Sequence, residues 1–289
     1  MRDQNANVVA AVHYRRMTAD DLPAAHKLSL SARWPHRLDD WKFIHELGEG
    51  IVAEDESGIV GTIMCWLHGP DYASLGMIIV SPDHQHQGIA KELVSRILKV
   101  AGDRTILLNA TASGLHLLEG FGFVQNGWIH RHQGSVFRTP FVSLGSGERI
   151  RPISQRDESA LADMANRSTG MPRATVIKHL LTVADVVAID HYGELIAFAA
   201  LRKFGLGYVI GPVVAPDADR AKALIAHWAG THAGSLVRVD VPHSSGLSPW
   251  LIEMGLVQVD ETVNSMVRGE PPRPDPSITR YALLSQSLG

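Results

Sequence analysis

The chain contains an internal repeat, and this feature constrains its fold more than any other. Four blocks occur twice in the same order: Arg15, Met17, Thr18 and Asp21 with Arg151, Ile153, Ser154 and Asp157, residues 51–61 with 186–193, Pro82-Asp83 with Pro216-Asp217, and 122–125 with 255–258. The offset falls from 136 to 133 residues along these blocks, as two copies of one fold with small deletions would show. The alternative is that unrelated α/β segments share common turns.

Both copies predict the same order of elements. Thr18 and Ser154 each precede an aspartate by three residues, which is the Asp variant of a helix-capping box. A helix, two β-rich runs, a strand ending at a proline, a helix, a further strand and a Gly-containing hairpin then follow. This alternation predicts an α/β protein of the α+β type, in which each copy is a mixed, twisted sheet flanked by helices. Residues 145–147 indicate a flexible joint, so we expect domains at residues 10–142 and 148–289.

Composition argues against several classes of protein. The net charge of −3 provides no basic field for nucleic acid or an anionic membrane, so neither is expected as a partner. The apolar runs are shorter than the roughly 20 residues that a membrane-spanning helix needs. Cys65 is the single cysteine, which excludes an internal disulfide, and we expect a cytoplasmic protein that is a monomer or a homodimer. No spacing among the 15 histidines predicts a metal site.

Residues 78–90 contain the features of an anion-binding turn. An apolar strand runs into Pro82, a polar turn with Gly88 follows, and an amphipathic helix begins at Ile89. Such an arrangement directs backbone N–H groups and a helix N-terminus at one point. Gly88 lets the backbone approach a phosphate closely, and the small Ala90 leaves the helix start open.

The turn Gln85-His86-Gln87-Gly88-Ile89-Ala90 resembles the pyrophosphate-binding signature of the GCN5-related N-acetyltransferase (GNAT) superfamily. That signature is Gln or Arg, two residues, Gly, one residue, and Gly or Ala. Residues 105–123 are also similar to the superfamily's strand, short helix and Gly-Phe hairpin. The resemblance implies two tandem GNAT-like domains and acetyl-CoA as the donor substrate. The implied reaction is direct attack by the primary amine of a small metabolite on the acetyl group.

The resemblance also implies which residues bind acetyl-CoA. The main chain of Ile78, Ile79 and Val80 would pair with the pantetheine arm as an added strand. The backbone of Gln85, His86, Gln87, Gly88, Ile89, Ala90 and Lys91 would hold the pyrophosphate, and Asn109 would bond near the arm. A backbone N–H of the splayed strand would stabilise the oxyanion.

The chain departs from the superfamily at the expected proton donor. Many members have a tyrosine four residues before the glycine of the Gly-Phe pair, and here that position is Leu118. Ser113 and His116 are the nearby catalytic candidates. The strand at residues 73–80, which often supplies a general base, contains no acidic residue, so the base is unassigned.

The second copy differs at the equivalent turn, residues 217–222, which has no glycine. Asp217 and Asp219 would repel a pyrophosphate. We expect a degenerate domain that shapes the acceptor site or an interface. The alternative is that the second copy binds CoA through a different turn.

Residues 32–41 are expected to determine the acceptor, because this region is variable in the superfamily. The candidate substrate-binding residues are Trp34, His36, Arg37 and Trp41, with Asp240 in the second copy. The alternatives are inward packing of the helix around Trp41 and a structural role for Asp240. A non-catalytic acyl-CoA sensor or scaffold, and a transferase for protein N-termini or lysines, are the other functions compatible with the sequence.

Overall fold

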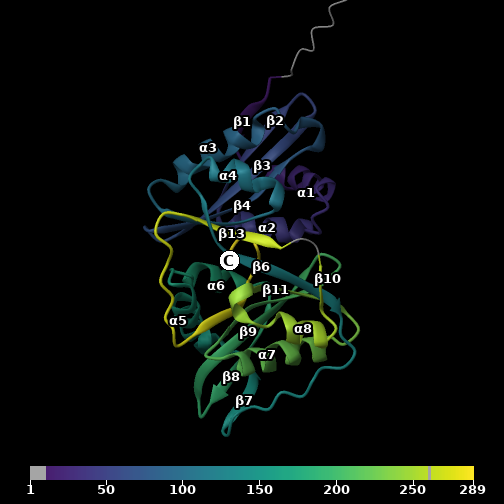
Figure 1. Ribbon diagram of the computed structural model, residues 1–289, viewed down its shortest axis with the longest axis vertical. Helices are drawn as coiled ribbons and strands as arrows, with labels where there is room; N and C mark the ends of the chain where they lie inside the picture. The colour runs from purple at the N-terminus through teal and green to yellow at the C-terminus, as the bar shows by residue number, and fades with distance from the viewer. Residues whose placement is uncertain (1–10, 260–261) are drawn as a thin grey trace, which may run out of the picture. The chain divides into compact units, whose positions relative to one another are not determined.

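The computed structural model describes residues 11–259 and 262–289 (Figure 1). The chain divides into two compact units: residues up to Cys65 together with Met77–Gly102, and Trp66–Gly76 together with Asp103–Gly289. Strands β3 (Gly58–His68) and β4 (Tyr72–Val80) run from one unit into the other. These units do not coincide with the domains predicted at 10–142 and 148–289, which remain a prediction. Residue 10 lies outside the described residues.

The first unit contains strands together with three helices that pack with them. Its elements are β1 (His13–Arg16), α1 (Leu22–Ser31), α2 (Leu38–Leu47), β2 (Glu49–Asp55), most of β3, the end of β4 and α3 (Ile89–Ala101). β2 pairs antiparallel with both β1 and β3. Helix α3 buries Ile89, Leu93 and Ile97, and a Cβ at Gly61 of β3 would lie 3.1 Å from Ile89 Cγ2. The absence of a side chain at Gly61 therefore lets α3 lie close to the strand.

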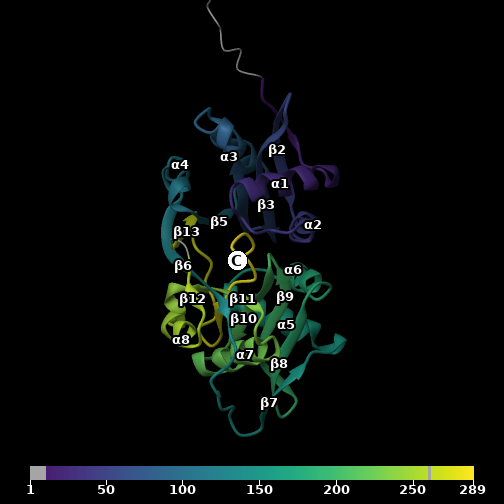
Figure 2. The ribbon, with the colours of Figure 1, turned by 90° about the vertical axis from the view of Figure 1, so that its right-hand side faces the viewer.

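The second unit contains most of the strands. Its elements are β5 (Thr105–Ala110), α4 (Leu115–Glu119), β6 (Val124–Ser135), β7 (Glu148–Pro152), α5 (Glu158–Thr169), α6 (Ala174–Leu180), β8 (Asp185–His191), β9 (Glu194–Phe204), β10 (Gly207–Ala215), α7 (Ala218–Thr231), β11 (Leu236–Pro242), α8 (Ser248–Glu253), β12 (Val257–Gln258), β13 (Val263–Arg268) and β14 (Thr279–Ala282). From β4 onward the strand order is β4-β5-β13-β6-β11-β10-β9-β8-β7, with β12 beside β6 and β14 beside β10. Figure 2 shows these strands with α5, α6 and α7 around them.

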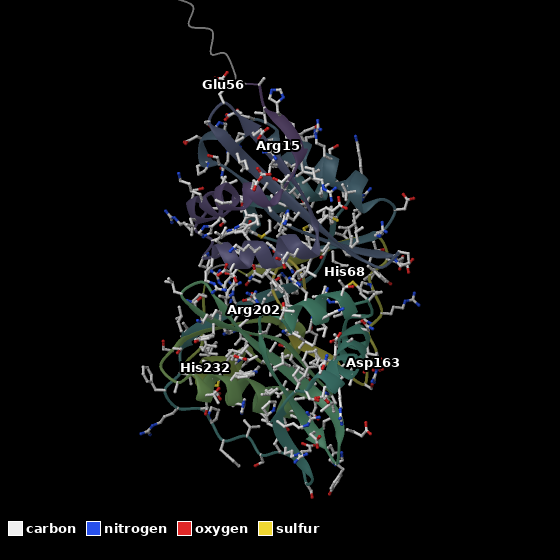
Figure 3. The ribbon with its side chains drawn as sticks, turned by 180° about the vertical axis from the view of Figure 1, so that it is seen from behind. Arg15, Glu56, His68, Asp163, Arg202 and His232 are labelled. Carbon is white, nitrogen blue, oxygen red and sulfur yellow. The ribbon has the colours of Figure 1, made fainter. Side chains whose placement is uncertain are left out.

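The predicted repeat is present in atomic detail. Arg15, labelled in Figure 3, binds Asp21 at 2.7 Å, and Arg151 binds Asp157 at 2.8 Å. Both aspartates complete a capping box, with Thr18 in the first copy and with Ser154 in the second. The order β2-β3-β4-α3-β5 recurs as β8-β9-β10-α7-β11. The predicted α+β class, with mixed sheets flanked by helices, is confirmed.

The core of the second unit lies between α7 and one face of β8–β11. Alternate residues Ala197, Ala199 and Leu201 of β9 are buried in this core, as the two-residue period of a strand requires. Trp228 of α7 packs there, and its indole N–H donates to the Ala199 carbonyl oxygen at 3.1 Å. In the described part of the chain, no helix combines the length and apolar character needed to cross a membrane.

The last strands of the two copies are exchanged, which the repeat did not predict. β13 comes from the second copy but lies between β5 and β6 of the first, pairing antiparallel with both. β6 in turn pairs with β11 of the second copy along residues 129–135. Gly122, at φ +82°, lies in the turn that connects α4 to β6, where the sequence predicted a Gly-Phe hairpin. The two copies therefore share one set of strands within the second unit, and a boundary drawn along the sequence does not separate them.

Candidate functional site

The turn after β4 forms an open helix N-terminus. Gly88 is the N-cap of α3 at φ +83°, and the first intrahelical bond runs from Glu92 N–H to the Gly88 carbonyl oxygen at 3.0 Å. The amides of Ile89, Ala90 and Lys91 precede this bond, and an α-helix provides them with no internal acceptor. A Cβ on Gly88 would meet no heavy atom of the described residues within 4 Å. The space before the helix is thus open to an anion, as a pyrophosphate cradle requires.

The two glutamine side chains of this turn bond to its own backbone. Gln85 Nε2 donates to the Val80 carbonyl oxygen at 3.4 Å, and Gln87 Nε2 donates to that of Asp83 at 3.3 Å. Both amides thereby stabilise the turn itself. His86 adopts φ +63°, a conformation that non-glycine residues rarely take and that is enriched at functional sites.

The strand before this turn has an edge without a strand partner. β4 pairs in parallel with β5 over Tyr72–Leu75 and Thr105–Leu108, and the pairing ends there. In the strand order of the described residues, β4 has only β3 and β5 as neighbours, so Ile78–Val80 has one edge with no strand beside it. Met77 adopts φ +54° at the start of this stretch, and its carbonyl oxygen accepts a 2.8 Å bond from Thr62 Oγ1. Such an edge can pair with an extended ligand.

In the second copy, residues of the protein itself occupy the helix N-terminus and the strand edge that correspond to those of the first copy. Asp217 caps α7 by accepting from the Arg220 N–H at 3.0 Å, so a carboxylate of the protein stands at that helix N-terminus. Arg220 also binds Glu148, with Nε 2.9 Å from Oε1. Strand β14 pairs antiparallel with Val213–Ala215 of β10, the residues that match the end of β4 in the repeat. An anion and an extended ligand would each compete with a group of the protein.

The predicted catalytic candidates are solvent-exposed in the second unit. Ser113 lies in a single turn before α4, with Oγ 3.1 Å from Thr111 Oγ1. The His116 side chain is fully exposed, and Nδ1 is 4.0 Å from Glu119 Oε2. Leu118 is buried. Ser113 and His116 belong to the second unit, whereas residues 78–91 belong to the first. The catalytic roles of Ser113 and His116 therefore stay predictions.

Asn109 lies inside β5, one residue before that strand ends at Ala110. Its Nδ2 donates to the Gln286 carbonyl oxygen at 2.7 Å, and its Oδ1 accepts from Ser265 Oγ at 2.7 Å. Both ends of the amide thus bind the protein. Its predicted contact with the pantetheine arm is untested.

The predicted acceptor residues of the first unit differ in accessibility. Trp34 is half-buried, and its ring lies 5.9 Å from that of His36. Arg37 Nη2 is 3.1 Å from Asp40 Oδ1. Trp41 is 0% exposed, and its indole N–H donates to Ser29 Oγ at 3.1 Å. The burial of Trp41 favours the inward-packing alternative for this residue.

Asp240 is also engaged within the protein. It is 1% exposed, and its two oxygens accept from Nε and Nη2 of Arg238 at 2.9 and 2.6 Å. Its carbonyl oxygen accepts from the Leu283 N–H at 2.9 Å. These contacts favour the structural alternative for Asp240.

A buried polar cluster in the second unit had no signal in the sequence. His68, labelled in Figure 3, has Nε2 3.0 Å from Ser74 Oγ and 3.4 Å from Arg173 Nη1. Burial, and then the positive charge of Arg173, lower the pKa of His68 to about 3. Burial, and then Arg280, lower the pKa of Arg173 to about 9. His68 is therefore neutral in the folded protein. In the described residues, no three His, Cys, Asp or Glu side chains are grouped so as to hold a metal ion.

His68 should make the protein less stable in acid. Its folded-state pKa of about 3 lies below its ordinary value of 6.5, so below about pH 6.5 the unfolded chain takes up a proton that the folded chain does not. The free energy of unfolding is therefore not lowered by this titration above the ordinary pKa. It falls as pH drops from there toward 3, by at most about 1.4 kcal/mol per pH unit. His68→Gln should have a shallower decline in urea-unfolding free energy between about pH 6 and pH 4. Equal slopes for the two proteins would contradict this.

Known proteins share both copies. A model described as "Acetyltransferase (GNAT) family" matches residues 15–123, and one described as "Acetyltransferase (GNAT) domain" matches residues 161–282. The Uncharacterized N-acetyltransferase YitH of Bacillus subtilis (strain 168) is 28% identical over 272 residues, covering 91% of this chain and 93% of the relative.

Two solved structures share the fold along nearly their whole length. A putative acetyltransferase from Pyrococcus horikoshii has a TM-score of 0.79 at 18% identity, with 100% of this chain and 99% of that chain covered. A tandem GNAT protein from the clavulanic acid biosynthesis pathway has a TM-score of 0.63 at 12% identity, with 91% and 99% covered. The two matched family regions together span most of the sequence, one in each copy of the repeat. The chain therefore belongs to the GNAT superfamily of N-acetyltransferases and carries two GNAT domains in tandem.

Proposed function

We propose that the first copy alone binds acetyl-CoA and that the protein transfers the acetyl group to the primary amine of a small metabolite. The contrast between the copies supports this proposal. The first copy has a glycine-capped helix N-terminus and a strand edge without a strand partner among the described residues. In the second copy, Asp217 caps the helix and β14 pairs with the equivalent edge. The second copy is then a degenerate domain, as its acidic turn predicts.

The proposed reaction needs few groups from the protein. The neutral amine nitrogen attacks the thioester carbonyl carbon, the carbon–sulfur bond breaks, and CoA leaves as a thiolate while the amine proton passes to a base. The backbone at residues 85–91 would hold the pyrophosphate of the donor, and the main chain of Ile78–Val80 would align its pantetheine arm. Leu118 is buried and has no proton to donate, so Ser113 and His116 remain the candidate donors.

Calorimetric titration with acetyl-CoA tests the proposal through its stoichiometry. We expect one site per chain, because both places in the second copy are occupied by the protein. Two sites would contradict the degenerate assignment, and no binding would contradict the function.

A chromatographic assay of CoA release should then identify the acceptor class. The acceptors would be an amino acid, a polyamine, glucosamine and a lysine-containing peptide, each with the acetylated product measured. Transfer to a small amine would support the proposal, and transfer only to the peptide would contradict it. One-site binding without transfer to any of them would favour an acyl-CoA sensor.

A further inference from the structure

The turn between β4 and α3 is connected to the β2–β3 turn by one side chain, that of His84. Residues 82–88 are all exposed except His84, which is half-buried. His84 Nε2 is 2.9 Å from Asp55 Oδ2, and the Asp55 side chain is 5% exposed. Gln85 and Gln87 instead bond to Val80 and to Asp83, within the turn and the strand before it.

Asp55 is itself fixed by the turn that follows it. Asp55 ends β2, and Glu56, labelled in Figure 3, lies between β2 and β3. Asp55 Oδ1 accepts from the Ser57 N–H at 2.8 Å and from the Ser57 hydroxyl at 2.6 Å. The bonds from Ser57, and after them the bond from His84, lower the pKa of Asp55. A carboxylate only accepts hydrogen bonds, so Nε2 of His84 carries the proton of this pair.

The backbone connects the two ends of the turn to neighbouring elements. Ser81 N–H donates to the Val60 carbonyl oxygen of β3 at 2.8 Å, and Gly88 accepts the first bond of α3. His86 lies between these ends at φ +63°, a conformation that persists only where surrounding contacts hold it. The bond from His84 to Asp55 supplies such a contact two residues before His86.

The second copy has neither this turn nor this pair. Helix α7 begins at Ala218, directly after its cap Asp217, so no exposed turn separates it from β10. The strand pairs β1–β2 and β7–β8 have the same register, and this register aligns Asp55 with His191. The His191 ring lies 4.8 Å from that of Tyr192. The pair therefore occurs in the copy that carries the proposed pyrophosphate turn.

We infer that His84 is a positioning residue for the donor, and that its bond to Asp55 holds residues 85–88 in the conformation that receives the pyrophosphate. The inference rests on the proposed function, in which the backbone of residues 85–91 binds that group. The other ring nitrogen of His84, Nδ1, is buried and has no hydrogen-bond partner among the described residues. The ring therefore acts through the turn and not by touching the ligand. Asp55 and residues 82–91 all belong to the first unit.

Two substitutions of His84 separate the hydrogen bond from the volume of the ring. His84→Gln keeps an N–H donor, whereas His84→Leu keeps an apolar side chain of similar size and removes the donor. In calorimetric titration we expect acetyl-CoA to bind about tenfold more weakly to His84→Leu, because a hydrogen bond to a charged group is lost. The affinity of His84→Gln should stay within about twofold of the wild type.

Two further variants complete the test. Asp55→Ala removes the acceptor and should weaken binding about as much as His84→Leu, with less than about a twofold further loss when both are combined. Lys42→Leu removes an exposed ion pair with Asp39 in the same unit and should leave the affinity unchanged. Circular dichroism checks that each variant is folded.

The outcomes separate this inference from the proposed function. Full affinity in His84→Leu, or equal losses in His84→Leu and His84→Gln, would overturn the role of the hydrogen bond. Additive losses in the double variant would show that the two residues act separately, which would overturn the pair. In each of these cases the wild-type protein still binds acetyl-CoA, so the proposed function stands. No binding to the wild-type protein would overturn both.

Discussion

Gly88→Asp should reduce the affinity for acetyl-CoA by at least about a hundredfold, which corresponds to roughly 2.7 kcal/mol. Gly88 adopts φ +83°, where an L-residue other than Asn or Asp is strained, and it caps α3 at the place proposed for the pyrophosphate. An aspartate there would put a carboxylate into the open space before the helix, where like charges repel. Its own carboxylate would also accept hydrogen bonds from the amides at the helix start, as Asp217 does in α7.

Gly88→Asn is the matched control, because asparagine has nearly the same size and also tolerates a positive φ but carries no charge. We expect its loss of affinity to be clearly smaller than that of Gly88→Asp. Calorimetry with acetyl-CoA measures both, and circular dichroism checks that both variants are folded. Retained affinity in Gly88→Asp would show that the donor binds elsewhere.

Gly211→Ala should lower the free energy of unfolding by about 3 kcal/mol, at the upper end of what added volume in a packed site costs. The new Cβ would lie 1.9 Å from the carbonyl oxygen of Leu283 and 2.9 Å from its carbonyl carbon. These are backbone atoms next to β14, so no side-chain rotation relieves the overlap. Residues 283–289, which follow β14, must move away from β10, and the pairing of β14 with Val213–Ala215 is weakened as a result.

Urea denaturation measures this loss, and Gly127→Ala provides the control. Gly127 also lies in a strand, β6, but a Cβ there would be 3.8 Å from its nearest neighbour, Ser265 Cβ. We expect that variant to change stability by less than about 1 kcal/mol. Equal stability of the two variants would mean that residues 283–289 do not lie against β10 in solution.

The features that were predicted correctly depend on residues close together in the chain. The capping boxes join residues three apart, Thr18 with Asp21 and Ser154 with Asp157, so their spacing alone predicts the bonds. The helix that begins at Ile89 is likewise a local consequence of an amphipathic pattern. Because both copies carry such patterns in the same order, the tandem α+β fold followed from the sequence.

The tertiary structure decided what lies beside these elements. Asn109 binds Gln286, 177 residues away, and His68 lies against Arg173, 105 residues away. No short-range pattern encodes such contacts, because they depend on which strands pair. The exchange of β6 and β13 is a pairing of this kind, since the backbone N–H and C=O groups that pair strands are the same in both copies.

Burial decided between substrate binding and a structural role for two side chains whose role the sequence left open. Trp41 and Asp240 have residue types that suit a binding site, yet one is packed in the core and the other is held by Arg238. The repeat, the open turn at Gly88 and the acidic turn of the second copy could be recognised from the sequence, because neighbouring residues determine backbone conformation and capping. The pairing of β14 with β10 and the placement of Ser287 against Gly76 exist only in the folded chain, where burial and strand pairing bring distant residues together.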